Sequence, residues 1–268
     1  MKELFELADH TLSGCECAIK KIHDKYGRPR PYYDKNKNIY WKYDENKMEH
    51  ICVFKTVRMI SAFRAIFVLF DNKYYQEVYV ILRTIVESLN DISFLLENYQ
   101  QGKLTQHQQR FIEQCFLDHF KNRENIMEGP KPRDVVPRRK VQAGSARFLS
   151  SVIDPTVAKT IADLEEDVYS GYTHGTAQCV LEFYGVNDGY FPEFSCNGIY
   201  NKVKMMSNLS QIFIYFHRFI NKVSTVCALF GFTKESDNLR QNRIDIETLL
   251  LPIGLDFSNK KKGLLTTR

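Results

Sequence analysis

Apolar residues recur along most of this chain at the three- and four-residue steps that place side chains on one face of an α-helix. The steps are clearest over a span of about 26 residues, 74–99, whose apolar stripe consists of Val78, Ile81, Leu82, Ile85, Leu89, Ile92, Leu95 and Leu96. Further helices are predicted over 1–25, 48–70, 105–127, 155–174 and 199–232. Because only a short D-N break separates 48–70 from 74–99, these two helices are expected to form a long antiparallel pair.

One stretch favours strands instead. After His174 the chain reads V-L-E-F-Y-G-V-N-D-G-Y-F-P-E-F-S, in which aromatic and β-branched residues flank the turn sequence V-N-D-G. This pattern predicts a small β-hairpin insertion. The fold class is therefore all-α: a helical bundle around a long antiparallel pair, forming a single domain over 1–268.

Three segments lack a helical period. Residues 26–45 are rich in Tyr, Asn and Lys and are predicted to form a surface loop anchored by Tyr40 and Trp41; the alternative is that their aromatic residues form a binding face. Residues 129–146 contain three prolines and two glycines and are predicted to be a second surface loop. Residues 250–268 are expected to be a flexible tail.

Positive charge is concentrated in one part of the chain. The net charge is only +5, but residues 121–147 carry eight basic and three acidic residues, an excess equal to that of the whole protein. Clustered Lys and Arg bind phosphates and release counterions. The candidate nucleic-acid-binding residues are Arg133, Arg138, Arg139 and Lys140.

Composition and missing motifs limit the chemistry. The seven cysteines form no C-x-x-C pair and are expected to be free thiols of a cytoplasmic protein. The N-terminus carries acids where an export signal needs basic residues, and 209–232 is too interrupted by polar residues to span a membrane, so no membrane partner is expected. No phosphate-binding loop, H-E-x-x-H or Glu-x-x-His motif is present, and no metal or other cofactor is expected.

The segment D-V-Y-S-G-Y-T-H-G-T contains the first candidate site. In a helix, Asp163, Asp167, Ser170 and His174 lie on one face, where a carboxylate can hold an imidazole and raise its basicity for acid–base catalysis. The alternative is that His174 is a helix-terminal residue that bonds the last carbonyl groups, since Gly171 and Gly175 are both able to end the helix.

The segment R-T-I-V-E contains the second candidate site. Arg83 and Glu87 are four residues apart on one face of the predicted helix 74–99, and Leu82 and Ile85 of the apolar stripe flank Arg83. A partly buried Arg needs a partner, so the two are predicted to form an ion pair. The functional alternative is that Arg83 points its planar donors into a cleft to hold a phosphate or a developing anion.

Together, R-T-I-V-E-S-L-N-D-I-S-F-L-L and Y-S-G-Y-T-H-G resemble segments of a widespread family of uncharacterised bacterial helical proteins. The matching residues are Arg83, Thr84, Glu87, Tyr169, Ser170 and His174. Such proteins are compared with the HEPN superfamily, whose active members are metal-independent RNases of toxin, CRISPR and abortive-infection systems. HEPN nucleases place four to six residues between an Arg and the catalytic His, whereas Tyr169, Val168 and Asp167 occupy those positions here.

The resemblance implies that Arg83 supplies the missing cation. The implied catalytic set is then His174, Arg83, Glu87, Tyr172 and Ser170. Two functions remain open. One is an RNase-like effector that acts on RNA or another nucleic acid, in bacterial phage defence. The other is a non-catalytic helical interaction module, a sensor or a toxin-neutralising partner, with a protein partner. A homodimer is compatible with both.

Overall fold

The structure is a computed structural model that describes residues 2–33, 37, 39–117, 127, 135–149, 154–176, 179, 184–186, 192–194 and 202–253. Its helices are α1 (Lys2–Tyr26), α2 (Met48–Asp71), α3 (Tyr75–Leu96), α4 (Gln106–Phe116), α5 (Arg138–Phe148), α6 (Pro155–Thr173), α8 (Lys202–Leu229) and α9 (Thr233–Leu250), with short 3₁₀ turns at Tyr99–Gln101 and Leu251–Ile253. Its strands are β1 (Arg30–Tyr33), β2 (Ile39–Lys42), β3 (Tyr184–Val186) and β4 (Pro192–Phe194). The predicted all-α class is confirmed.

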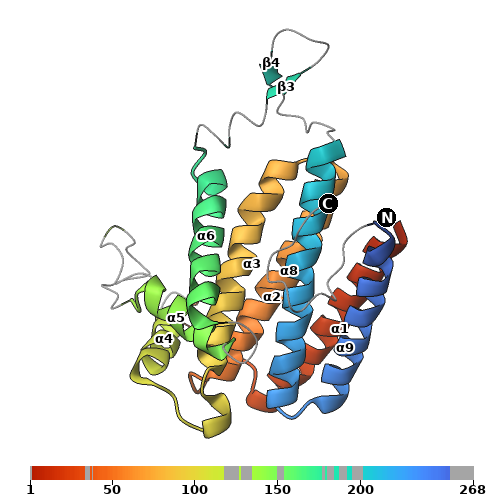
Figure 1. The fold of residues 1–268 in the computed structure, drawn as a ribbon. Helices are drawn as coiled ribbons and strands as arrows, with labels where there is room; N and C mark the ends of the chain where they lie inside the picture. The colour runs from red at the N-terminus through yellow and green to blue at the C-terminus, as the bar shows by residue number, and fades with distance from the viewer. Residues whose placement is uncertain are drawn as a thin grey trace.

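Helix α3 lies at the centre of the bundle. It packs against α2, α5, α6 and α8. On the far side α1 and α9 pack against each other, α1 also packs against α2 and α8, and α9 also packs against α8 (Figure 1). The predicted antiparallel pair is α2 and α3. Lys73 joins them in the left-handed conformation, with φ of 67°, and Asn72 Nδ2 donates to Val68 O at 2.8 Å to close the end of α2.

Aromatic rings fill the space between α2 and α8. The Phe63 ring meets Phe216 edge-on at 5.0 Å and Phe219 at 5.2 Å between centroids, and all three side chains are fully buried. Edge-to-face pairs of this kind add to the stabilisation from buried apolar area. The cluster fixes α8 against the central pair and so sets the position of the polar residues that α8 carries.

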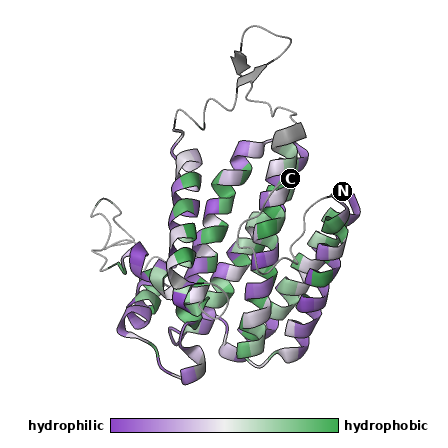
Figure 2. Ribbon diagram, in the orientation of Figure 1, coloured by the Kyte–Doolittle hydropathy of each residue, from purple (hydrophilic) through white to green (hydrophobic). Residues whose placement is uncertain are grey.

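Helix α9 was not among the predicted elements. Its mostly polar sequence buries only a narrow stripe, Ser236, Leu239, Ile246 and Leu250, against α1 and α8. In Figure 2 the long helices alternate between hydrophobic and hydrophilic stretches, and the hydrophilic share is large on α9. A stripe this narrow gives a weak periodic signal in the sequence.

The predicted loop over 26–45 contains a two-stranded antiparallel hairpin. Strands β1 and β2 pair with Arg30 opposite Lys42 and Tyr33 opposite Ile39. Trp41 is 66% exposed, so it does not anchor this segment as predicted. The anchor is Tyr43, whose hydroxyl lies 2.7 Å from His23 Nε2 and whose ring packs 4.0 Å from that of the buried His50.

The predicted loop over 129–146 is wrong from Arg138 onward, because that part forms α5. The glycine in this helix marks a close helix contact, since a Cβ on Gly144 would collide with the Phe94 ring of α3. Pro137 stands just before the first helical residue, where its ring is tolerated. Residues 128–134 lie outside the described residues.

Three other predicted segments are described in part by the structure: the helix over 105–127, the hairpin after His174 and the C-terminal tail. Helix α4 ends at Phe116, before the predicted end at 127. The predicted hairpin after His174 is confirmed by β3 and β4, which pair antiparallel with Val186 opposite Pro192. The predicted flexible tail begins as a 3₁₀ turn, and its residues 254–268 lie outside the described residues.

Within the described part of the chain, every helix is too short or too polar to serve as a membrane span. Helix α8 is the longest, and it carries polar side chains along its length.

Candidate functional site

Helices α3 and α6 pack side by side and bring together residues that are 87 positions apart in the chain. Arg83 Nε donates to Glu87 Oε1 at 3.0 Å, and Arg83 Nη1 donates to Ser170 Oγ at 3.4 Å. The predicted ion pair is therefore confirmed. Its side chains are 24% and 38% exposed, so the guanidinium group is held from two sides and still reaches solvent.

Tyrosine rings lie beside this ion pair, one helical turn of α3 away from Arg83. Tyr79 on α3 stacks on Tyr172 of α6 with ring centroids 4.6 Å apart, and on Tyr169 at 6.0 Å. Burial raises the pKa of the Tyr169 hydroxyl above its ordinary value. The sequence interpretation included Tyr172 and missed Tyr79. The spacing in the sequence could have identified Tyr79, because this residue lies four positions before Arg83 and therefore on the same face of α3.

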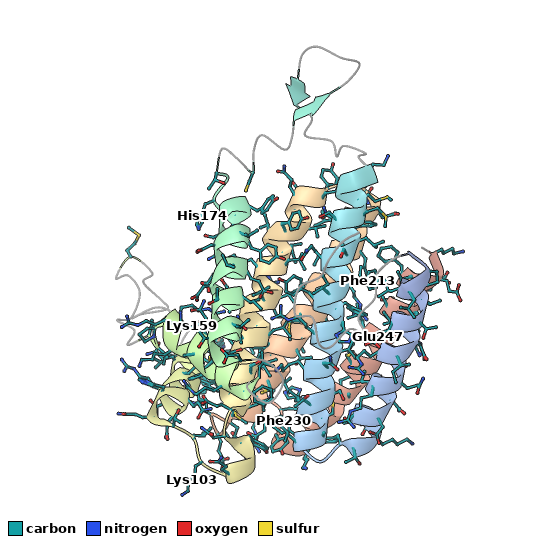
Figure 3. The ribbon with its side chains drawn as sticks, viewed as in Figure 1. Lys103, Lys159, His174, Phe213, Phe230 and Glu247 are labelled. Atoms are coloured by element: carbon teal, nitrogen blue, oxygen red, sulfur yellow. The ribbon has the colours of Figure 1, made fainter. Side chains whose placement is uncertain are left out.

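His174 lies at the C-terminal end of α6 with an exposed side chain (Figure 3). Its backbone N–H donates to Ser170 O at 2.9 Å, so it occupies the helix-terminal position that the sequence suggested. The imidazole itself bonds no carbonyl group among the described residues. It therefore caps the helix through its backbone and leaves its ring open to solvent.

The two glycines beside His174 have different roles. Gly175 has φ of 61°, the left-handed region that favours glycine, and it ends the helix. Gly171 remains helical, and the chain folds back over it: a Cβ at that position would lie 3.2 Å from Cys179 Sγ. Gln76 of α3 secures this returning segment by donating to Cys179 O at 2.9 Å.

The carboxylates predicted to orient His174 do not contact its ring. Asp163 pairs with Lys159 at 2.7 Å on an exposed part of α6, and the Asp167 side chain is exposed. A shared helix face is necessary for such contacts, but side chains two or three turns apart are too far apart to bond. Ser170, one helical turn before His174, connects this end of α6 to the Arg83–Glu87–Ser170 cluster that the hydrogen bonds of Arg83 form.

The candidate nucleic-acid-binding residues divide into two kinds. Arg138 Nη1 donates to Asp91 Oδ1 at 2.6 Å and its Nε lies 3.4 Å from Glu166, so its charge is engaged inside the bundle. Arg139 and Lys140 are exposed on α5. Arg133 lies outside the described residues.

The cysteines agree with the expectation of free thiols as far as they are described. Cys15, Cys52 and Cys227 are buried and unpaired, and burial raises the pKa of each thiol. A buried neutral thiol behaves as a small apolar side chain. Cys196 lies outside the described residues.

No curated protein matches the chain. No solved structure matches it either. A family profile matches residues 49–191, more than half of the 268 residues, and this region contains both Arg83–Glu87 and Ser170–His174. The chain therefore belongs to DUF5677, a family of unknown function.

Proposed function

We propose that this protein acts on RNA as a metal-independent, HEPN-like ribonuclease, an effector of the kind used in bacterial phage defence. The observation that carries the proposal is the Arg83 guanidinium group, held by Glu87 and by Ser170, which precedes the exposed His174 by one helical turn on α6. One turn of an α-helix rises about 5.4 Å. In the proposed complex, a phosphodiester group lies between the side chains of Arg83 and His174.

The proposed chemistry uses one group for proton transfer and one for charge. His174 accepts the proton of a ribose 2′-hydroxyl while O2′ bonds to phosphorus and the bond from phosphorus to O5′ breaks. The leaving O5′ takes a proton from water. Arg83 stabilises the negative charge that develops on the phosphoryl oxygens, and Glu87 and Ser170 fix its orientation.

Stacked tyrosines support a nucleic-acid substrate. Tyr79 and Tyr172 present aromatic surface beside the cluster, and aromatic side chains commonly stack on bases of single-stranded RNA. Arg139 and Lys140 supply exposed positive charge on α5. Arg138 is not proposed to bind RNA in this arrangement, because its ion pairs with Asp91 and Glu166 already engage it.

The test is a cleavage assay on single-stranded RNA in the presence of EDTA. Replacing the proton-transfer group, His174→Ala, is expected to lower the cleavage rate by roughly 10²- to 10⁴-fold. The free energy of unfolding should change by less than about 1 kcal/mol, because the side chain is exposed. His10→Ala, which removes another exposed histidine on α1, is the matched control and should cleave like the parent.

Arg83→Lys separates charge from geometry in the same assay. Lysine keeps the positive charge and loses the planar set of donors that spans Glu87 and Ser170. Cleavage should fall well below that of the parent. Cleavage by the parent that His174→Ala does not alter, or no cleavage by the parent, would contradict the proposal.

The alternative function is a non-catalytic interaction module, a sensor or a toxin-neutralising partner. It is favoured by the fact that Arg83 already has two protein partners, as a residue that only joins α3 to α6 would have. If this role is correct, Arg83→Met should lower the midpoint of urea unfolding while RNA binding by the parent is absent. A half-exposed pair of this kind is worth about 1 kcal/mol or less.

A further inference from the structure

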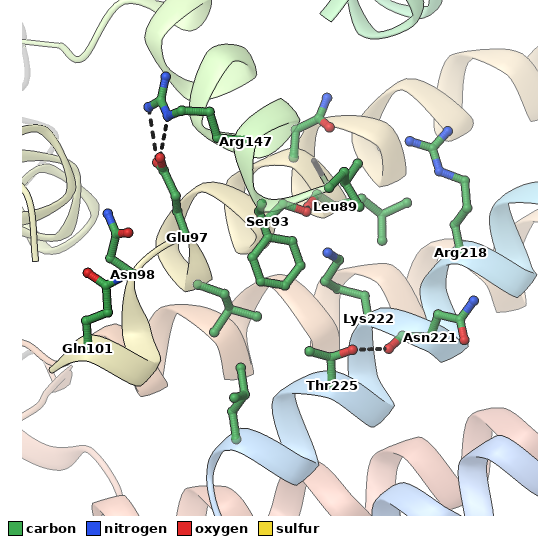
Figure 4. Close-up of a pocket in the computed structure, with 15 residues that line it drawn as sticks. Leu89, Ser93, Glu97, Asn98, Gln101, Arg147, Arg218, Asn221, Lys222 and Thr225 are labelled. Carbon is green, nitrogen blue, oxygen red and sulfur yellow. Dashed lines mark hydrogen bonds and ion pairs between the residues drawn. The ribbon is translucent and has the colours of Figure 1, made fainter. Parts of the chain in front are cut away.

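A cavity lies between α3, α5 and α8, lined by side chains that the proposed RNA site does not use. Its volume is about 550 Å³, within the range of small-molecule sites. Its apolar walls include Leu89, Leu229 and Phe148. Its polar groups include Asn90, Arg218 and Lys222. Figure 4 shows the Lys222 side chain reaching from α8 towards Leu89 and Ser93 of α3.

Lys222 is the most unusual of these groups. It is 8% exposed, and its Nζ lies 4.2 Å from the centroid of the Phe148 ring. Among the described residues, no oxygen accepts a hydrogen bond from its ammonium group and no carboxylate pairs with it. Burial, with a smaller contribution from the positive charge of Arg218, lowers the pKa of Lys222 to about 7. A buried ammonium group without an acceptor strongly favours any anion that can reach it.

Asn90 contributes a second donor without an acceptor. The residue is 4% exposed, and its Oδ1 accepts from Ser145 Oγ at 3.1 Å. Its Nδ2 is buried and has no acceptor. Buried donors normally have acceptors, and leaving one unpaired is costly. Asn90 and Lys222 both line this cavity, and each has a donor without an acceptor, so a ligand that satisfies them needs an oxygen that accepts hydrogen bonds.

The charges around the cavity sum to a single positive excess. Arg147 Nη2 donates to Glu97 Oε2 at 3.1 Å, and Arg218 pairs with Glu165 at 2.6 Å. These two pairs are neutral overall. Protonated Lys222 is left as the uncompensated charge. A ligand with one negative charge balances the site, whereas a dianion exceeds it.

From the two unpaired donors and the apolar walls, we propose that this cavity binds a small organic carboxylate with an apolar body. The carboxylate oxygens accept hydrogen bonds from Lys222 Nζ and Asn90 Nδ2. The apolar part lies against Leu89, Leu229 and Phe148. This site is separate from the Arg83 cluster, so its occupation does not depend on whether the protein cleaves RNA.

The test uses octanoate as the probe and 1-octanol as its neutral match. Calorimetric titration of the full chain at pH 6.5 is expected to show binding of octanoate and much weaker binding of octanol. Lys222→Met should weaken octanoate binding about tenfold or more, the effect of losing a charge-assisted hydrogen bond. Lys234→Met, which removes an exposed lysine on α9, is the matched control and should bind like the parent.

The pH dependence provides an independent readout. Octanoate binds the protonated form of Lys222, so its affinity should fall as the pH rises from 6.5 to 9, and this fall should be absent in Lys222→Met. The ionisable groups around Lys222 are Cys52 on α2, Glu97 on α3, Arg147 on α5, Glu165 on α6 and Arg218 on α8. The arginines keep their charge over this range, and burial raises the pKa of Cys52 beyond it.

Several outcomes would overturn the proposal. Equal binding of octanoate and octanol would show that the cavity recognises only the apolar chain. Equal affinity of the parent and Lys222→Met would remove Lys222 from the site. Binding of inorganic phosphate in place of octanoate, or failure of acetate, octanoate and benzoate alike, would reject the carboxylate.

Discussion

Lys222→Met is expected to stabilise the protein at neutral pH by an amount on the order of 3 to 5 kcal/mol. The buried amine has a pKa lowered from 10.5 to about 7, chiefly by burial, and each unit of this shift corresponds to about 1.4 kcal/mol. Methionine has a similar length and carries no charge. It should fill the same space beside Phe148 without the cost of removing an ammonium group from water.

The effect should depend on pH in a defined direction. Between pH 7 and 10.5 the unfolded chain holds a proton on Lys222 that the folded protein has lost, so the stability of the parent rises with pH in this window. Below pH 7 both states are protonated and the contribution to the slope ends. The advantage of Lys222→Met should thus be largest at or below pH 7 and disappear near pH 10.5.

Urea unfolding of the parent, Lys222→Met and Lys234→Met at pH 6, 7.5 and 9 measures this effect. Lys234 is exposed, so its replacement should leave stability and its pH dependence nearly unchanged. A less stable Lys222→Met protein would mean that the ammonium group has a favourable partner in the folded state. A more stable variant would show that the parent keeps a destabilising lysine in its interior, as expected of a residue that serves binding.

Lys222 also illustrates where sequence periodicity stops being informative. In the sequence it is one of the polar residues that interrupt the apolar stretch 209–232, and it argued only against a membrane span. Periodicity identifies the faces of a helix, but whether a polar face meets water depends on the neighbouring helices. Here α3 and α5 cover the Lys222 face of α8, and neither contact could be derived from the spacing within α8.

Only part of the candidate RNA site could be predicted from the sequence. The Arg83–Glu87 pair follows from local geometry, because residues four apart in a helix are neighbours, and it was predicted. The contact from Arg83 to Ser170 joins two helices, and only the resemblance linked those two segments. The expected contact between His174 and an acid of α6 failed, because a shared face was taken as a shared contact. Tertiary packing decided the contact between the two helices, and the geometry within one helix decided the other two outcomes.

Asp91→Asn is expected to destabilise the protein by roughly 3 to 5 kcal/mol, the cost of removing one partner from a buried ion pair. The Asp91 side chain is 7% exposed and joins three helices: Oδ2 lies 2.7 Å from Lys55 Nζ on α2, and Oδ1 accepts from Arg138 of α5 at 2.6 Å. Asparagine keeps the shape and removes the charge. Two cations, each 30% exposed, then lose their shared carboxylate.

A double-mutant cycle with Arg138→Met separates this network from general damage to the core. If Arg138 serves Asp91, the two substitutions should be strongly non-additive, since each removes the same interaction. Asp163→Asn is the matched control on α6, where the exposed pair with Lys159 should contribute less than about 1 kcal/mol. Simple additivity of Asp91→Asn and Arg138→Met would mean that Arg138 is not tied to Asp91, and Arg138 would then rejoin Arg139 and Lys140 as a cation available for RNA.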